Sequence, residues 1–142
     1  FYRNADTPVR NGRNAATKGK GKASLSDEAS LIADKSVRVP SGVIFFGTST
    51  YAAVEAMELL ADEGIELNAM RARAFPFGKS FRDFVDEHER IFVIEQNRDA
   101  QFRSLMMIEL GVDASKLISV LNYDGMPITA DNIYRQIRGG LS

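Results

Sequence analysis

The stretch GVIFFGTSTYAAVEAMELLADEG, residues 42–64, decides the fold of this 142-residue chain. Val43–Phe46 is a short, continuous apolar run closed by Gly47, which is typical of a strand buried on both faces. The apolar residues that follow recur at helical spacing: Ala53, Val54, Met57, Leu60 and Ala61. Thr48, Ser49 or Thr50 can cap this helix, and Gly64 suits the position just after its end. A buried strand that leads directly into an amphipathic helix predicts one unit of a parallel α/β sheet.

The same strand–helix alternation continues to the end of the chain. Further strands are expected at residues 65–73, 91–94 and 117–121, and further helices at 79–89, 98–111 and 128–140. Thr129 is the expected N-cap of the last helix, and Gly111 and Gly139 are expected just after two helix ends. The connections are short, so the sequence predicts a three-layer α/β/α domain over residues 41–142, with a mostly parallel sheet of about five strands. Val37–Val39 is the candidate for the edge strand.

The N-terminal segment differs from the rest in composition. Residues 1–24 carry six Lys or Arg and one acidic residue, whereas residues 25–142 carry twelve Lys or Arg and eighteen acidic residues. Large apolar residues are scarce there, so we expect a basic flexible tail or linker, followed by a short helix and edge segment over residues 25–40. A nucleic-acid arm and a solvated linker or interface strap are both open. No aromatic residue lies among the KGKGK lysines to stack on bases, which favours the linker.

Composition excludes several kinds of site. The chain has no cysteine and a single histidine, His88. A disulfide framework, a thiolate zinc site, a cysteine-held iron–sulfur cluster, a cysteine nucleophile and a His-rich metal site are therefore ruled out for this chain. No apolar run approaches the roughly 20 residues of a membrane-spanning helix, and the first residues lack the apolar core of a secretory signal. We expect a cytoplasmic protein without membrane contact.

Four loops follow the expected strands, and ligands of open parallel sheets bind at that edge. The first, Gly47–Thr48–Ser49, places backbone N–H groups and hydroxyls at a helix N-terminus, where an anion is favoured. The chain contains neither GxxxxGK[ST] nor GxGxxG. The alternative is a helix packed closely on the sheet, with Gly47 allowing the approach. One hypothesis is therefore a free-standing module that binds the phosphate of a nucleotide or of coenzyme A.

The segment EQNRDAQ, residues 95–101, is the densest polar cluster. Glu95 follows a buried strand and could act as a general acid or base there. It could equally be a structural carboxylate paired with Arg98 or Arg103. Asp99 is a plausible N-cap of the following helix.

His88 and the segment YDGMP are expected to have structural roles. His88 lies between acidic residues, where a surface histidine at a helix end is expected. YDGMP, residues 123–127, predicts a turn. Tyr123 could stack on a ligand or seal an interface, and the interface is favoured. No complete set of nucleophile, base and metal ligands is found, so the residues alone predict a domain without catalytic machinery.

Three segments carry a resemblance to a known family. VIFFGTSTYAAVEAMELLADEGIELNAMRARAFPF, ERIFVIEQNRDAQ and NYDGMPITADNI together resemble the C-terminal domain of the alpha subunit of 2-oxoacid:ferredoxin oxidoreductases of the 2-oxoglutarate type. The resemblance covers about residues 37–138. It implies the fold of the transketolase C-terminal domain: a five-stranded, mostly parallel sheet with one antiparallel edge strand.

The resemblance also implies a function. In such enzymes a 2-oxoacid is oxidatively decarboxylated to an acyl-CoA while ferredoxin is reduced, with thiamine diphosphate, Mg²⁺, an iron–sulfur cluster and coenzyme A. This chain lacks the GDG…N diphosphate motif, so it is expected to bind none of these alone, to be inactive in isolation, and to pack against the remaining alpha-subunit domains and the beta subunit. Ferredoxin would be an indirect partner. The candidate ligand-lining or interface-lining residues are those of the strand-end loops: Gly47, Thr48, Ser49, Glu95, Asn97, Arg98, Tyr123 and Asp124.

Overall fold

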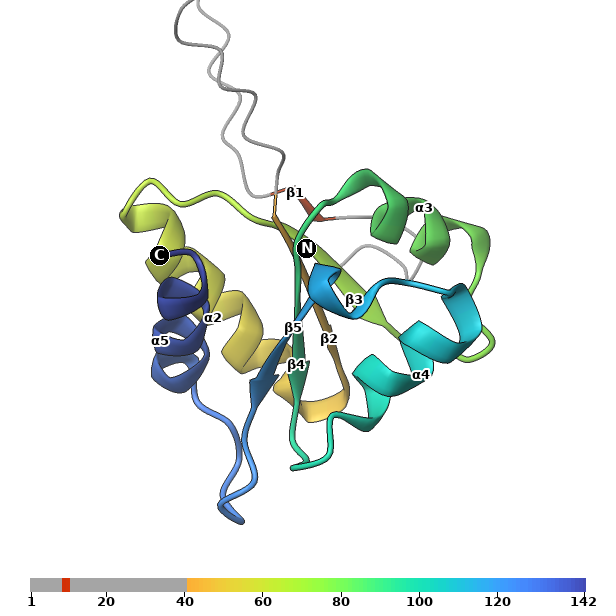
Figure 1. Ribbon diagram of the computed structural model, residues 1–142. Coiled ribbons are helices and arrows are strands. Elements are labelled where there is room, and N and C mark those ends of the chain that lie inside the picture. Colours follow the sequence, from red (N-terminus) through yellow and green to blue (C-terminus); the bar gives the residue numbers. More distant parts are fainter. Residues whose placement is uncertain (1–8, 11–40) are drawn as a thin grey trace, which may run out of the picture.

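A computed structural model describes residues 9–10 and 41–142, which alternate between strands and helices. After an initial two-residue strand, each further strand of the described residues is followed by a helix (Figure 1). The strands are β1 (Val9–Arg10), β2 (Gly42–Phe46), β3 (Asn68–Ala72), β4 (Ile91–Glu95) and β5 (Leu117–Leu121). The α-helices are α2 (Thr50–Asp62), α3 (Lys79–Glu87), α4 (Gln101–Leu110) and α5 (Ala130–Gly140), with 3₁₀ turns at Gly47–Ser49 and Ala114–Lys116.

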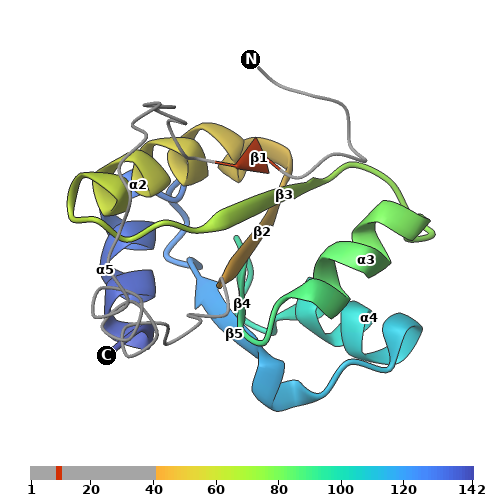
Figure 2. The ribbon, with the colours of Figure 1, turned by 90° about the horizontal axis from the view of Figure 1, so that it is seen from above.

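The sheet has the order β1-β3-β2-β4-β5. Strands β2 to β5 are parallel, and β1 pairs antiparallel with β3. Seen from above, the sheet runs between two pairs of helices, with α2 and α5 on one face and α3 and α4 on the other (Figure 2). The predicted three-layer fold and its mostly parallel sheet, with one antiparallel edge strand, are thus confirmed.

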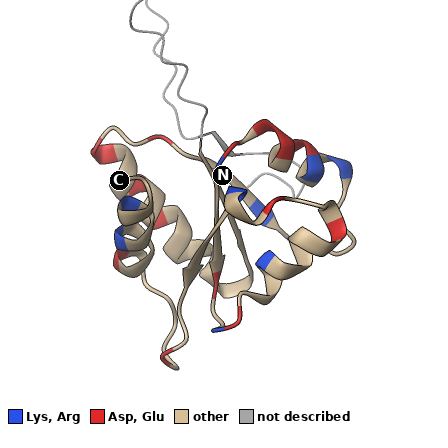
Figure 3. Cartoon of the chain, viewed as in Figure 1, with Lys and Arg blue, Asp and Glu red and all other residues tan. Residues whose placement is uncertain are grey.

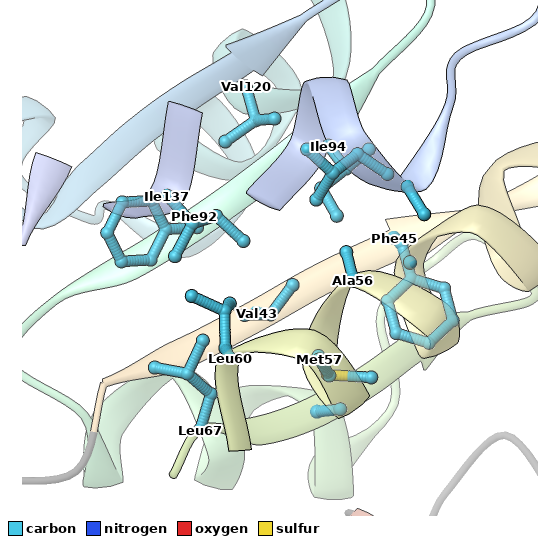
Figure 4. Packing of buried hydrophobic residues seen from close by; sticks show 14 of the residues in the cluster. Val43, Phe45, Ala56, Met57, Leu60, Leu67, Phe92, Ile94, Val120 and Ile137 are labelled. Atoms are coloured by element: carbon cyan, nitrogen blue, oxygen red, sulfur yellow. The ribbon is translucent and has the colours of Figure 1, made fainter. Parts of the chain in front are cut away.

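The two faces of the sheet build two separate cores. Val43 and Phe45 point toward α2 and α5, where they pack with Leu60, Phe92 and Ile137 (Figure 4). The alternate residues of the same strands point toward α3 and α4: Ile44, Met70, Ile91 and Val93. Every residue of β4 is buried. Because both faces are covered, the strands read as continuous apolar runs, which is why the sequence identifies them.

The edge strand comes from an unexpected part of the chain. Val9 pairs with Ala69 and Arg10 with Asn68, so the segment predicted as a tail contributes β1. The candidate edge strand Val37–Val39 and the expected short helix lie outside the described residues. A two-residue strand has too short a pattern to be found by periodicity, and its pairing depends on the edge that β3 offers.

Helix ends agree with the sequence at most positions. Gly64 and Gly111 have φ of 78° and 67°, and Thr129 caps α5 by accepting a hydrogen bond from the Asn132 amide at 3.2 Å. Gly139 was expected beyond the last helix, but α5 continues through Gly140. A Cβ on Gly140 would lie 2.8 Å from the ring of Phe92 in β4, so glycine is needed there for α5 to pack closely on the sheet.

Helices α2 and α5 are also joined on the surface. Tyr134 and Arg138 of α5 both donate hydrogen bonds to the Glu63 carboxylate at the end of α2, the latter at 2.7 Å. Charged side chains as a group lie on the helices and loops, while the strands are nearly free of them (Figure 3). No helix of the described part of the chain is long and apolar enough to span a bilayer.

Candidate functional site

The loop after β2 turns its hydroxyls inward. Gly47 has φ of 58°, and it opens the 3₁₀ turn that leads into α2. Ser49 is buried and donates to the Phe46 carbonyl at 2.6 Å, and Thr50 donates to the Gly47 carbonyl at 2.7 Å. The N-cap residue of α2 is Ser49, and its side chain makes no capping hydrogen bond, which corrects the expectation of a hydroxyl cap. A Cβ on Gly47 would meet open space, so its conformation, rather than close packing, calls for glycine there.

Gln96 joins the loops at the ends of three strands. Its Nε2 donates to the Thr48 hydroxyl oxygen at 2.9 Å, and its Oε1 accepts from the Ile128 amide at 3.2 Å. Thr48 follows β2, Gln96 follows β4, and Ile128 precedes α5. One amide side chain therefore fixes the loops after β2, β4 and β5 relative to one another.

Glu95 is completely buried at the end of β4 and stabilises the start of α4. Its carboxylate accepts hydrogen bonds from the main-chain amides of Phe102 and Arg103, both at 2.8 Å, and from Asn97 Nδ2 at 2.9 Å. These amides belong to the first turn of α4, where no intrahelical acceptor exists. Glu95 thus caps a helix that is seven or eight residues further along the chain.

The expected arginine partners lie elsewhere. Arg98 pairs with Asp99 at 2.8 Å on the surface. The guanidinium of Arg103 donates to the carbonyls of Leu117 and Ala114, both at 2.8 Å. The predicted Glu95–arginine pair is therefore wrong, because backbone amides already supply the donors. The predicted N-cap at Asp99 is also wrong, since the N-cap residue of α4 is Ala100.

The loop after β5 is held by its own side chains. The buried Asn122 donates to the Met126 carbonyl at 2.7 Å and to Asp124 at 3.3 Å, and Asp124 accepts from the Met126 amide at 2.9 Å. The Asn122 amide also bonds to the Glu95 carbonyl at 3.0 Å, which extends the β4–β5 pairing. This arrangement leaves the side chains of Tyr123 and Met126 exposed, at 64% and 69%.

An aromatic cluster lies beside these loops on the α3–α4 face. Phe77 stacks on Phe81 with ring centroids 4.4 Å apart, and Phe46 lies 4.7 Å from Phe102. Phe75 packs edge-on against Phe77 yet remains 55% exposed. The cluster therefore reaches the surface at Phe75, in the loop after β3.

His88 lies before β4, at the opposite end of the sheet, and it is buried. The expectation of a surface histidine is wrong. One ring nitrogen, Nδ1, donates to the Phe84 carbonyl at 2.6 Å, and the other, Nε2, accepts from Asn68 Nδ2 at 2.9 Å. Because both nitrogens are used and the ring is far from the strand-end loops, His88 has a structural role.

Several side chains of the strand-end loops are held by hydrogen bonds to one another and to the backbone. The side chains of Ser49, Glu95 and Asn97 are engaged in the hydrogen bonds above, whereas Thr48 and Tyr123 remain exposed. Among residues 41–142, no group of three or more potential metal-ligating side chains is found. Ligand binding by the candidate residues stays a prediction.

Sequence reasoning missed Gln96 and Asn122 as organising residues of this edge. Both are amide side chains directly after a buried strand, at the ends of neighbouring strands. That position is a usable signal, but their bonding partners come from loops distant in sequence.

Comparison with known proteins gives a fold but no family assignment. No protein-family model matches the chain, and no curated protein matches it significantly. Among solved structures, 2-oxoglutarate:ferredoxin oxidoreductase from Magnetococcus marinus, with 2-oxoglutarate, coenzyme A and succinyl-CoA bound, is similar with a TM-score of 0.66 and 20% identity. The match covers 100% of this chain and 20% of that chain, so this chain spans a fifth of the oxidoreductase chain.

Two further solved structures agree with this fold. A split-gene transketolase, an inactive beta4 tetramer, has a TM-score of 0.57 and 18% identity over 72% of this chain and 39% of that chain. The alpha chain of a probable 2-oxoacid ferredoxin oxidoreductase from Thermoplasma acidophilum has a TM-score of 0.51 and 19% identity over 96% of this chain and 98% of that chain. The chain therefore has a fold that occurs in 2-oxoacid:ferredoxin oxidoreductases and in transketolase.

Proposed function

We propose that this chain is a non-catalytic, subunit-interface domain of the alpha subunit of a 2-oxoacid:ferredoxin oxidoreductase of the 2-oxoglutarate type. Its parent complex would oxidatively decarboxylate the 2-oxoacid to an acyl-CoA and reduce ferredoxin. Thiamine diphosphate, Mg²⁺ and the iron–sulfur cluster would be held by the other domains and by the beta subunit. The fold shared with the Magnetococcus marinus and Thermoplasma acidophilum oxidoreductases supports this proposal.

One observation carries the interface role. Phe75, Tyr123 and Met126 are large apolar side chains, each more than half exposed, and all lie in loops after the strands. Tyr123 and Met126 share the loop after β5, whereas Phe75 follows β3, which is separated from β5 by two strands of the sheet. Exposed aromatic and methionine side chains of this kind are enriched in protein interfaces. The hydrogen bonds of Gln96, Glu95 and Asn122 hold this surface rigid, which lowers the entropy cost of binding.

Co-expression of the chain with a candidate thiamine diphosphate-binding beta subunit tests the proposal. The full chain should co-purify with that subunit and should be required for 2-oxoacid-dependent reduction of ferredoxin by the complex. Titration of the isolated chain with thiamine diphosphate and Mg²⁺ should give no heat of binding. Micromolar binding, or turnover by the isolated chain, would contradict the proposal.

Surface variants locate the interface. We expect Tyr123→Asp and Met126→Asp to reduce co-purification, because each places a charge in the apolar contact. Ile108→Asp is the matched control: Ile108 is 78% exposed, but it lies near the far end of α4, away from the strand-end loops. Equal loss for all three variants would argue against an interface at this end.

A further inference from the structure

Strand β5 forms one outer edge of the sheet. In a strand, successive residues direct their N–H and C=O groups to opposite sides. The Asn122 amide points inward to the Glu95 carbonyl of β4. The alternate positions Leu117, Ser119 and Leu121 therefore direct their backbone groups outward, toward the place that a sixth strand would occupy.

Gln136 of α5 occupies the outward groups of Leu121. Its Oε1 accepts from the Leu121 amide at 3.1 Å, and its Nε2 donates to the Leu121 carbonyl at 3.0 Å. The remaining hydrogen of Nε2 goes to Asn132 Oδ1 at 2.5 Å. A side-chain amide thus makes the same pair of hydrogen bonds that a neighbouring strand would make.

Arg103 of α4 closes the other end of the edge. Its Nε donates to the outward carbonyl of Leu117 at 2.8 Å. Helices α4 and α5 cover opposite faces of the sheet (Figure 2). Arg103 and Gln136 therefore reach the edge from opposite faces. Among the described residues, no partner is found for the outward backbone groups of Ser119, which lies between them.

We propose that Gln136 and Arg103 together guard the β5 edge against pairing with the β5 edge of a second copy of this chain. The strand sequence LISVL has no charge and no proline, and it is rich in apolar and β-branched residues. An open edge of this kind is a template for strand addition between copies. Among the described residues of the edge, only Ser119 keeps unpaired outward backbone groups, and one residue is too short to nucleate a strand ladder. The domain then makes its contacts through other parts of its surface.

Self-association of the full chain tests the guard. Sedimentation velocity over a concentration series should find the wild-type chain without β5-mediated dimers. Gln136→Ala should raise the association constant by about three- to tenfold for each edge hydrogen bond that it frees, and Gln136→Ala with Arg103→Ala should raise it further. Arg135→Ala is the control, since the neighbouring Arg135 is exposed and pairs with Asp131 rather than with the edge.

A second substitution identifies the surface that pairs. Ser119→Pro removes the central outward N–H and is compatible with an edge position. Added to Gln136→Ala, it should restore the wild-type association state. Association that persists in this double variant, or a Gln136→Ala chain that folds and does not self-associate, would overturn the proposal.

Hydrogen exchange supplies a measurement that needs no variant. In the wild-type chain the Leu121 amide should be protected and the Ser119 amide should exchange rapidly. Protection of Ser119 in the wild type would mean that another segment already covers the edge, and it would refute the guard. Neither experiment needs the oxidoreductase partner, so their outcome is independent of the proposed function.

Discussion

Replacing Glu95 by glutamine tests how strongly the end of β4 stabilises α4. Glutamine keeps the size of the side chain, but its single carbonyl oxygen can accept from only one of the two main-chain amides of Phe102 and Arg103. The other half-buried N–H then loses its acceptor, which costs about 1–3 kcal/mol. Loss of the negative charge at the helix N-terminus adds about 0.3–1 kcal/mol. We expect the free energy of unfolding to fall by about 2 kcal/mol.

Alanine should have a larger effect at the same position. Glu95→Ala deprives both amides and Asn97 of their acceptor and leaves a cavity, so a loss of about 3–4 kcal/mol is expected. For a domain of about 100 residues, each 1 kcal/mol lowers Tm by about 4–8 °C.

Urea unfolding followed by circular dichroism measures these differences, since the chain has no tryptophan. Glu109→Gln, on the exposed side of α4, is the control and should stay within about 0.5 kcal/mol of the wild type. A Glu95→Gln variant as stable as this control would refute the capping role of Glu95.

Three other predictions concern packing and charge. Gly140→Ala should lose about 1–3 kcal/mol of unfolding free energy, because its Cβ would lie 2.8 Å from the buried ring of Phe92. Gly139→Ala meets open space and should gain up to about 1 kcal/mol. Urea unfolding of the two variants compares these effects. Hydrogen bonds from Tyr134 and Arg138 hold the pKa of Glu63 below its usual 4.5. This interaction therefore stabilises the fold above that pH and is lost as the pH falls through the folded-state pKa. Glu63→Gln should make Tm less sensitive to acid below about pH 5, and a variant whose Tm is as acid-sensitive as that of the wild type would refute the contribution. His88→Ala removes two buried ring hydrogen bonds and should cost about 3 kcal/mol in thermal unfolding.

Sequence patterns found the elements that bury continuous apolar surface. The runs Val43–Phe46 and Ile91–Ile94 predicted buried strands, and both lie inside the sheet with a neighbour on each side. The patterns failed where few residues carry the signal. The edge strand Val9–Arg10 is held by its pairing with β3, and no periodicity can appear in two residues.

The candidate site was only partly predictable for a related reason. Strand-end loops were expected to gather at one edge, and the Gln96 bridge between Thr48 and Ile128 confirms that three of them do. One of the two interpretations of Glu95 paired it with a neighbouring guanidinium, because side-chain charge is visible in a sequence. The free amides of a helix N-terminus are not visible, and they are the donors that Glu95 uses.

By itself, the sequence determined the order and type of the main elements and the absence of cysteine chemistry, because apolar spacing and composition are local properties. Only the tertiary structure decided which polar groups meet: His88 with Asn68, Glu95 with the start of α4, and Gln136 with the edge of β5. These contacts depend on which backbone donors and acceptors the packed sheet leaves unpaired, and that is settled only when the strands and helices have assembled.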